Sequence, residues 1–409
     1  MKIVAMVLAG GRVDELGVLT LTRPKSAVPF GGIYRIIDFP LSNLHNSGID
    51  TVGILSQYNP AELISHIGSG IHWDLVGRGK GIKILPPYKG VRASDWYRGT
   101  ADAVYQNIAF IQAYNPEHVL ILSGDHIYCM DYNEIINMHV EKDAHLTVGF
   151  VKVSSCEGHR FGMADIGKDG HLEDYVEKPE KTNYEWASLT IYVFKKDVLF
   201  SALKKNAKEK SHEFGRDIIP MLMRENAGVY GYKFNGYWGY TRTIQEYYST
   251  SMEILGEEPK ITPESWGIRT NIYGNYHYDL PPARFYPSSD VEDAVFGRGC
   301  RVRGKVSHSV ISSNVVIDKG AVVKNSIIMA DCVIGEGTVV ENSIVDENVS
   351  IGRNSVIGGS KKITSVGKGA RIPEAVSVGE GCVIWPFTGE SAFKEKRIES
   401  GTTVGGEEI

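Results

Sequence analysis

A six-residue repeat in the last third of the chain constrains the fold more than any other feature. Apolar residues recur in register, separated by Gly, Asn, Asp, Ser and Lys: Val315, Ala321, Ile327, Val333, Val339, Val345, Ile351 and Ile357. Neither an amphipathic helix nor an alternating strand produces this spacing. Each face of a triangular parallel β-helix contributes one inward apolar residue per hexapeptide. We therefore expect a β-helix with these side chains inward, and a β-sandwich with accidental spacing as the alternative. The exposed ends of such a coil favour an oligomer.

The chain before this repeat has a different rhythm, in which short apolar strands alternate with amphipathic helical stretches from Met1 to about Leu255. This βαβ pattern predicts an α/β domain with a mostly parallel sheet and a ligand crevice at the carboxyl ends of its strands. Between the two patterns, proline, glycine and aromatic residues mix without a period. We predict a first domain over 1–255, a linker over 256–290 and the β-helix with a C-terminal tail over 291–409.

Charge and cysteine usage exclude several classes of function. The 44 basic and 49 acidic residues are nearly balanced, so we expect no nucleic-acid partner and no membrane partner, and a small-molecule substrate fits better. The five cysteines are far apart and form no CxxC pair, which argues against a disulfide framework and a structural zinc site. No apolar run reaches the length of a membrane span, and we expect a cytoplasmic protein.

A glycine-rich loop follows the first predicted strand and has the layout of a phosphate-binding turn. The apolar run that ends at Leu8 leads into Gly10 and Gly11, and a basic segment follows. Val13 and Glu15 then stand where such a loop would carry another glycine and a cation. The loop is therefore either an altered nucleotide site or a disabled one.

Four further segments place polar groups beside glycines at predicted strand ends: WYRGTADAV from Trp96, LSGDHIY from Leu122, VEKP from Val176 and HEFGRDIIP from His212. Together with PFGGIYRIIDFPLSN from Pro29, they resemble the bacterial ADP-glucose pyrophosphorylases (glucose-1-phosphate adenylyltransferases) over nearly the whole chain. The resemblance implies a Rossmann-like nucleotidyltransferase domain followed by a left-handed parallel β-helix, in an allosteric tetramer. It also implies the reaction of ATP with glucose 1-phosphate to ADP-glucose and pyrophosphate, for glycogen or starch synthesis.

The resemblance assigns residues to each part of such a site. It implies nucleotide binding at Leu8, Gly10, Gly11 and Gly99, and a Mg²⁺ ligand at Asp125. It implies binding of glucose 1-phosphate at Tyr97, Glu177, Lys178, Ser188, Glu213, Phe214 and Trp238. Glu213 is one methylene longer than the family's aspartate. Sugar-phosphate effectors are implied at Lys25 and Arg35, between the two domains.

Several positions depart from the family pattern where catalysis occurs. In the GGxGTRL loop, Val13 replaces a glycine and Glu15 replaces the catalytic arginine. In the family's WRDVG segment, Tyr240 replaces the second Mg²⁺-binding aspartate, and Arg242 replaces the glycine. Thr190 stands at another family glycine. A β-branched residue, an anion and a phenol at these positions all oppose polyphosphate binding or metal binding.

We interpret the chain as a catalytically impaired, regulatory subunit that joins an active paralogue in a heterotetramer, with a homotetramer as the other assembly. One alternative is an active enzyme in which Arg12, Arg23 or Arg242 restores the lost positive charge. Another is a free-standing sensor of glucose 1-phosphate or a nucleotide sugar.

Overall fold

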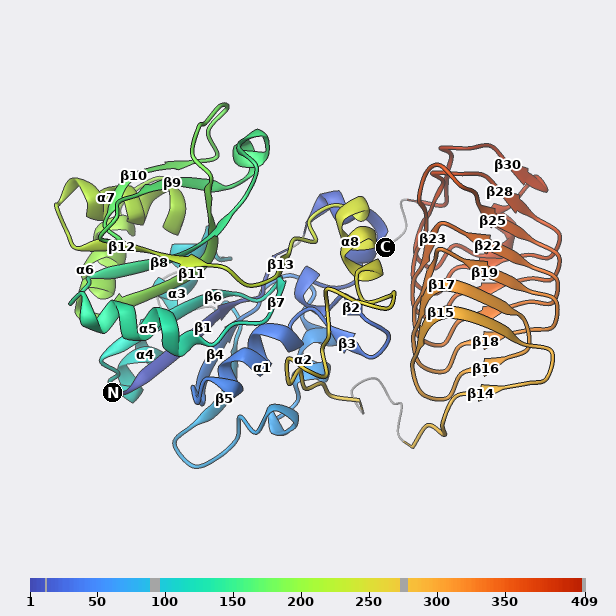
Figure 1. Cartoon of the computed structure of the whole chain (residues 1–409), viewed down its shortest axis with the longest axis horizontal. Helices are drawn as coiled ribbons and strands as arrows, with labels where there is room; N and C mark the ends of the chain where they lie inside the picture. Colours follow the sequence, from blue (N-terminus) through green and yellow to red (C-terminus); the bar gives the residue numbers. More distant parts are fainter. Residues whose placement is uncertain (12, 89–95, 273–278, 407–409) are drawn as a thin grey trace.

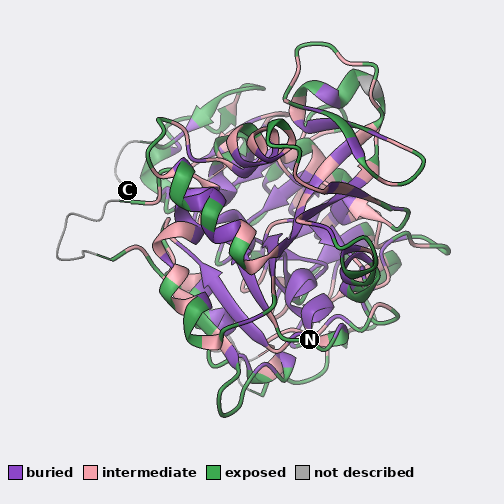
Figure 2. Cartoon of the chain, turned by 90° about the vertical axis from the view of Figure 1, so that its left-hand side faces the viewer, coloured by how far each residue is buried: buried purple, intermediate pink, exposed green. Residues whose placement is uncertain are grey.

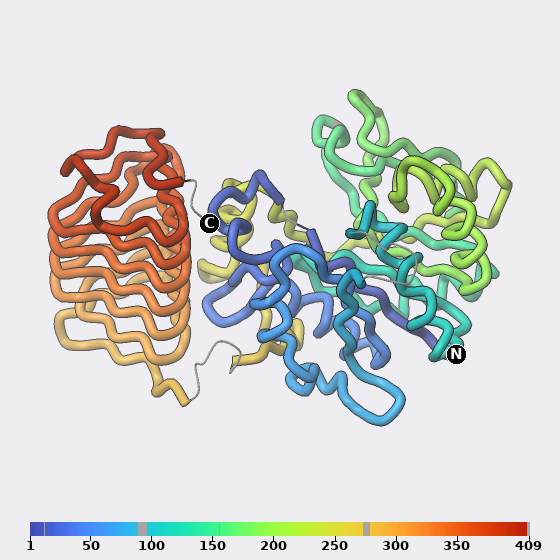
Figure 3. Tube along the Cα trace, turned by 180° about the vertical axis from the view of Figure 1, so that it is seen from behind, coloured from blue at the N-terminus to red at the C-terminus, as the bar shows by residue number. Residues whose placement is uncertain are grey.

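The computed structural model describes residues 1–11, 13–88, 96–272 and 279–406. An α/β domain and a coil of short parallel strands lie side by side along the long axis of the molecule (Figures 1 and 3). The two folds predicted from the sequence patterns are both confirmed.

The α/β domain is built on one nine-stranded sheet, which has the order β10-β9-β11-β6-β1-β4-β5, with β8 beside β11 and β12 beside β8. Its strands are β1 (Ile3–Leu8), β4 (Thr51–Leu55), β5 (Gly81–Leu85), β6 (His118–Ser123), β8 (Leu146–Lys152), β9 (Gly162–Ile166), β10 (Leu172–Glu177), β11 (Trp186–Lys195) and β12 (Val229–Phe234). Strands β6, β1, β4 and β5 pair in parallel, whereas β11 runs antiparallel to its neighbours. The parallel half therefore brings the carboxyl ends of its strands to one edge.

Helices cover both faces of this sheet because its parallel strands are apolar on both sides. They are α1 (Asp38–Asn46), α2 (Ala61–Ile67), α3 (Thr100–Gln106), α4 (Ile108–Tyr114), α5 (Tyr132–Glu141), α6 (Lys196–Asn206), α7 (Ile219–Arg224) and α8 (Ile244–Met252). Shorter turns are η1 (Asp14–Thr20), η2 (Lys25–Ala27), η3 (Ile71–Trp73), η4 (Ser155–Arg160), the π-helical η5 (Phe214–Ile218) and η6 (Glu390–Ala392). The small strand pairs are β2 (Pro29–Phe30) with β3 (Tyr34–Arg35), and β7 (Ile127–Tyr128) with β13 (Trp238–Gly239). Figure 2 shows the buried strands between the helices.

The coil is a parallel β-helix of stacked short strands. They are β14 (Arg284–Phe285), β15 (Asp290–Phe296), β16 (Arg301–Val302), β17 (Lys305–Ile311), β18 (Val316–Ile317), β19 (Val322–Lys324), β20 (Ile327–Ile328), β21 (Val333–Ile334), β22 (Val339–Glu341), β23 (Ser343–Val345), β24 (Ser350–Ile351), β25 (Val356–Gly358), β26 (Thr364–Val366), β27 (Arg371–Ile372), β28 (Ser377–Val378), β29 (Val383–Ile384), β30 (Arg397–Ile398) and β31 (Thr403–Val404). The described ladders in it pair in parallel throughout. All five cysteines of the chain are free thiols, and three of them are buried in the coil.

The prediction that all eight repeat residues point inward was wrong for three of them. Val333 is 40% exposed, while its neighbour Ile334 is fully buried in the coil. Val339 is likewise only partly buried, while its neighbour Val340 lies in the core of the coil. The reason is the register: Val316 pairs with Val333 and Val323 with Val340, an offset of 17 residues, not 18. A strict count of six therefore slips by one residue in each turn, and a one-residue slip reverses the side of the strand.

The third exception, Ile327, is buried outside the coil, in the contact between the two domains. It belongs to a hydrophobic cluster with Val310 and Ile344 of the coil and Phe30 and Tyr247 of the first domain. The outward face of β17, β20 and β23 therefore packs on η1, β2 and α8. A large apolar contact of this kind makes the two domains one packed unit.

The segment between α8 and β14 lies against the first domain where it is described. Trp266 contacts Phe39 and Tyr237 at ring-centroid distances of 6.3 and 5.6 Å, and Ile261 is fully buried. The first coil strand that pairs with another is β14. The divisions at 255 and 290 stay predictions. Among the helices of the described ranges, none combines the length and the apolar character needed to cross a bilayer.

Candidate active site

Two adjoining compartments open at the carboxyl ends of β1 and β6, where α/β proteins bind their ligands. Compartment A has a volume of about 350 Å³ and is lined by Glu177, Lys178, Ser188 and Trp238, among others. Compartment B, of about 340 Å³, lies next to it and is lined by Leu8, Gly10, Gly11, Tyr97 and Gly99, among others. The two share a boundary made of Val13, Lys25, Thr100, Ser123, Asp125, Thr190 and Glu213.

The four nucleotide-binding candidates all lie in compartment B, and two of them have no room for a side chain. A Cβ atom on Gly10 would lie 2.8 Å from the backbone nitrogen of Gln57. On Gly99 it would lie 2.3 Å from the carbonyl oxygen of His212. These glycines let the backbone close in tightly around the compartment.

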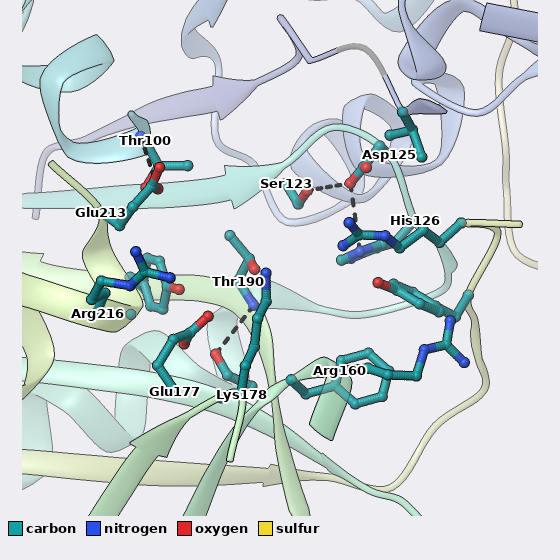
Figure 4. A pocket seen from close by; sticks show the side chains of 18 of the residues that line it. Thr100, Ser123, Asp125, His126, Arg160, Glu177, Lys178, Thr190, Glu213 and Arg216 are labelled. Atoms are coloured by element: carbon teal, nitrogen blue, oxygen red, sulfur yellow. Dashed lines mark hydrogen bonds and ion pairs between the residues drawn. The ribbon is translucent and has the colours of Figure 1, made fainter. Parts of the chain in front are cut away.

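Five of the seven sugar-phosphate candidates line compartment A. Glu177 and Lys178 lie on one side and Asp125 on the other, with Thr190 between them (Figure 4). The Glu177 carboxylate accepts a hydrogen bond from the Tyr175 hydroxyl at 2.7 Å. Lys178 follows β10 in a left-handed backbone conformation, with φ +49°, and its side chain is exposed. Together they combine an acceptor for hydroxyl groups with a cation for a phosphate.

The other two candidates lie elsewhere. Tyr97 lines compartment B, where its hydroxyl donates to the Leu85 carbonyl at 2.9 Å. Phe214 is 1% exposed and packs against Tyr192 and Phe194 at centroid distances of 5.4 and 5.8 Å. In the π-helical turn η5 the residues on either side of Phe214 face the cavity, while its ring points into the core.

Glu213 is held by the protein at the boundary between the compartments. Its carboxylate accepts hydrogen bonds from the Thr100 backbone N–H at 3.1 Å and from the Thr100 hydroxyl at 2.6 Å. The additional methylene, relative to the family's aspartate, is part of a side chain that reaches the start of α3. One oxygen of Glu213 is therefore already occupied before a sugar hydroxyl arrives.

Thr190 occupies a strained position at the same boundary. It adopts φ +55°, within the stretch where the pairing of β11 with β8 shifts register between Ser188 and Tyr192. A β-branched residue in the left-handed region is unfavourable, and glycine is the residue that adopts it freely. The left-handed backbone at this position explains why the family pattern has glycine there. In this chain a strained threonine side chain lies instead in the wall of both compartments.

Asp125 is paired with a cation of the chain itself. Its Oδ2 lies 3.0 Å from the Lys25 ammonium, and its Oδ1 accepts a hydrogen bond from the Ser123 hydroxyl. Burial disfavours the charged carboxylate, but the Lys25 charge outweighs burial and lowers the pKa of Asp125. Burial also lowers the pKa of the adjacent His126 to about 4, with Lys25 adding to the effect. Near neutral pH this corner holds one ion pair and a neutral imidazole.

Tyr240 fills the region opposite Asp125 with an aromatic ring. Its centroid lies 5.1 Å from that of Trp238, and burial raises the pKa of its hydroxyl. The Lys25 ammonium lies 5.3 Å from the ring centroid, and the Arg160 guanidinium carbon lies 4.9 Å from it. A neutral phenol between two cations is a cation–π arrangement and not a carboxylate ligand.

Glu15 and Arg242, two of the unusual residues, neutralise each other. The Arg242 guanidinium lies 3.0 Å from the Glu15 carboxylate, and Arg242 lines compartment A. The segment that carries Arg242 is held by the first turn of α8, where the Glu246 carboxylate accepts a hydrogen bond from the Arg242 backbone N–H at 3.1 Å. The other two arginines considered as replacement charges do not act here: Arg23 lies at the interface between the domains, and Arg12 lies outside the described residues.

These residues do not fit a Mg²⁺ site. No group of three or more His, Cys, Asp and Glu side chains suited to a metal occurs among the residues with described positions. Both oxygens of Asp125 already have partners within the protein, and Tyr240 offers no second carboxylate. A unit charge and a divalent ion about 4 Å apart repel by about 8 kcal/mol at an effective dielectric constant near 20, so Lys25 opposes a metal beside Asp125.

Two arginines of compartment A were missed in the sequence. Arg160 and Arg216 both line it, and Arg160 also forms an ion pair with Glu246. Each stands next to a Phe-Gly pair, Arg160 before Phe161 and Arg216 after Gly215. That signal is weak, because only the folded sheet brings the two segments to one cavity.

The two effector candidates lie in different places. Lys25 is in the cavity wall beside Asp125, and Arg35 is at the interface between the domains. There Arg35 belongs to a buried interdomain charge cluster that consists of Arg23, Arg35, Glu62, Asp346, Glu347 and Lys368. Effector binding at either residue stays a prediction, and in this cluster a carboxylate of the coil already contacts Arg35 at 3.0 Å.

Comparison with known proteins identifies two family models in the same chain. Residues 4–257 match the nucleotidyl transferase family, and residues 281–366 match the GlmU-like C-terminal hexapeptide family. Both agree with the α/β fold and the coil.

Full-length relatives carry one name. The glucose-1-phosphate adenylyltransferase of Thermotoga neapolitana is 45% identical over 98% of each chain, and that of Thermotoga maritima is 46% identical over 98% of each. The enzyme of the same name from Clostridium perfringens strain 13 is 44% identical over 79% of this chain and 82% of its own. Their names do not distinguish catalytic from regulatory subunits. With this identity over nearly its whole length, the chain belongs to the glucose-1-phosphate adenylyltransferase family.

Proposed function

We propose that this chain is a subunit of a glucose-1-phosphate adenylyltransferase that keeps a ligand cavity, has strongly reduced turnover of its own, and regulates an active paralogue in a shared tetramer. The names of the full-length relatives support the reaction class. The observation that carries the reduced turnover is the arrangement around Asp125, where Lys25 and the ring of Tyr240 take the space beside the carboxylate.

The chemistry of the reaction explains why this arrangement matters. A phosphate oxygen of glucose 1-phosphate attacks the α-phosphate of ATP, the bond to the β-phosphate oxygen breaks, and pyrophosphate leaves. Charge develops on phosphate oxygens, so positive groups must be free to stabilise it. In this chain Glu15 engages Arg242 and Asp125 engages Lys25. Two cations that could serve the transition state are thus already bound to carboxylates.

Ligand binding is supported by the opposite side of compartment A. Lys178 is exposed and can contact a phosphate, while Glu177 can accept sugar hydroxyls. Retained binding with little turnover is what a regulatory subunit needs, because an effect of about 1–3 kcal/mol across an interface changes a partner's affinity measurably.

The direct test is ADP-glucose synthesis by the purified chain, alone and mixed with an active paralogue from the same source, with and without sugar-phosphate effectors. We expect near-zero activity alone and a changed effector response in the mixture. Turnover by the chain alone at the level of its partner would contradict the proposal.

A series of variants separates the causes of the low turnover. We expect Val13→Gly with Glu15→Arg to leave the rate low, and Tyr240→Asp to be required in addition, since the loop pair does not change the surroundings of Asp125. Full rescue by the loop pair alone would mean that Tyr240 is unimportant.

One observation favours a second candidate, an active enzyme with substituted residues. Arg242 lines compartment A and compensates the charge of Glu15, so the loop does not repel phosphate as strongly as its sequence indicates. In that case Arg242→Ala would abolish ADP-glucose synthesis by the isolated chain, whereas a chain without turnover has no activity for this change to remove.

A further inference from the structure

The lining of compartment A carries more cations than carboxylates, although Glu15 and Glu246 outside the lining pair with two of the cations. Five cationic residues line compartment A, against three carboxylates: Lys25, Arg160, Lys178, Arg216 and Arg242 against Asp125, Glu177 and Glu213. Across the described ranges, no ion pair is found for Lys178 or Arg216. Both side chains are exposed and line the cavity, so they can contact an anion without first breaking an ion pair within the protein.

The carboxylate expected to bind a metal instead positions one of these cations. Asp125 holds the Lys25 ammonium at 3.0 Å, and this side chain is only 3% exposed, so it is fixed by its surroundings. Lys25 lies on the boundary of both compartments. A ligand that extends through both compartments would pass beside this ammonium.

Tyr240 extends the same arrangement. The Lys25 ammonium lies 5.3 Å and the Arg160 guanidinium carbon 4.9 Å from the centroid of its ring. The rings of Phe161 and Trp238 pack against it at centroid distances of 4.9 and 5.1 Å. The position at which the sequence pattern calls for a second acidic ligand is thus a platform for two cations. A metal would have to displace these groups before it reached Asp125.

We propose that this cavity binds phosphate-bearing ligands without a divalent cation, with Lys25, Lys178 and Arg216 supplying the positive charge. The ligand class is a sugar phosphate or nucleotide sugar, which rests on the proposed function. The metal independence does not rest on the proposed function, because it follows from the partners of Asp125 and Tyr240.

The test measures binding of ADP-glucose to the full-length chain by isothermal titration calorimetry, once with excess MgCl₂ and once with EDTA. We expect dissociation constants that agree within about twofold between the two buffers. A loss of affinity of about tenfold or more in EDTA would overturn the proposal.

Two variants at one position sharpen the test. Tyr240→Asp supplies a second carboxylate and should make ADP-glucose binding metal-dependent, with affinity higher in MgCl₂ than in EDTA by about tenfold. Tyr240→Asn removes the same ring without adding charge, and its binding should stay independent of the metal. Metal dependence in the asparagine variant would contradict the argument that Lys25 keeps a metal from Asp125, because removal of the ring alone would then admit the metal. Circular dichroism of both variants verifies that they are folded.

The outcomes also separate this inference from the proposed function. Binding that requires Mg²⁺ in the unmodified chain contradicts the inference alone. Turnover by the isolated chain together with metal-independent binding contradicts the reduced turnover alone. Absence of ADP-glucose binding in both buffers contradicts the inference and the ligand assignment together.

Discussion

Substitution of Arg23 by methionine tests how the two domains are held together. The Arg23 side chain is fully buried between them, where it pairs with Asp346 and, at 2.8 Å, with Glu347 of the coil. It also lies 3.4 Å from Glu62 of α2. Methionine has a similar length and no charge, so the substitution removes the ion pairs and leaves most of the buried volume filled.

The expected magnitude follows from the charge balance of the interdomain charge cluster. Arg23, Arg35 and Lys368 carry three positive charges, and the three carboxylates balance them. Burial opposes the charged guanidinium, but the carboxylates outweigh it and raise the pKa of Arg23. Without Arg23 one negative charge is left uncompensated, and Asp346 already has an oxygen with no hydrogen-bond partner among the described residues. Removal of one partner from such a buried pair costs about 3–5 kcal/mol.

Urea denaturation followed by circular dichroism measures this cost. We expect Arg23→Met to lower the free energy of unfolding by about 3–5 kcal/mol, and Arg23→Met with Asp346→Asn to recover a large part of the loss, since the double variant is neutral again. Arg397→Met is the control, because its pair with Glu399 is about three-quarters exposed on both sides and contributes below about 1 kcal/mol. A loss below about 1 kcal/mol for Arg23→Met, or no recovery in the double variant, would refute the reasoning.

Two further predictions concern the cavity wall. Because Thr190 adopts φ +55°, Thr190→Gly should raise the free energy of unfolding by about 1 kcal/mol in a urea titration. Thr190→Ser keeps a Cβ atom and should therefore gain less stability. Equal stability of the unmodified chain and both variants would contradict the strain at this position. The pKa of His126 is about 4 in the folded chain, below the unfolded value of about 6.5. The stability that its neutral imidazole contributes is therefore complete above pH 6.5 and is lost as the pH falls toward 4. Between about pH 7 and pH 5 this single residue should lower the free energy of unfolding by about 2 kcal/mol, and His126→Asn should flatten that part of the pH profile. An unchanged slope in the variant would assign the acid sensitivity to other groups.

The cavity residues divide into those that sequence reasoning could find and those that it could not. Leu8 and Gly10 stand at the carboxyl end of β1, and a parallel sheet brings the carboxyl ends of its strands to one edge whatever the details of the fold. Glu177 and Lys178 stand in a short motif at the end of β10, which runs antiparallel to β9, so the motif is readable in the sequence but only the folded sheet brings it to compartment A. Arg160 carries no such motif. It reaches the cavity because η4 and the start of β9 lie against Tyr240, which is 80 residues away in sequence.

The sequence alone determined the α/β domain and the β-helix, because each is a local pattern that neighbouring residues specify, and the family resemblance located the altered positions Val13, Glu15 and Tyr240. The tertiary structure decided the 17-residue turn of the coil, which turned Val333 outward. It also decided the partners of the charged groups, since ion pairs join residues that are remote along the chain, such as Lys25 with Asp125 and Arg35 with Glu347. Periodicity specifies which face of an element is buried, but the neighbour of a charge depends on how the elements assemble.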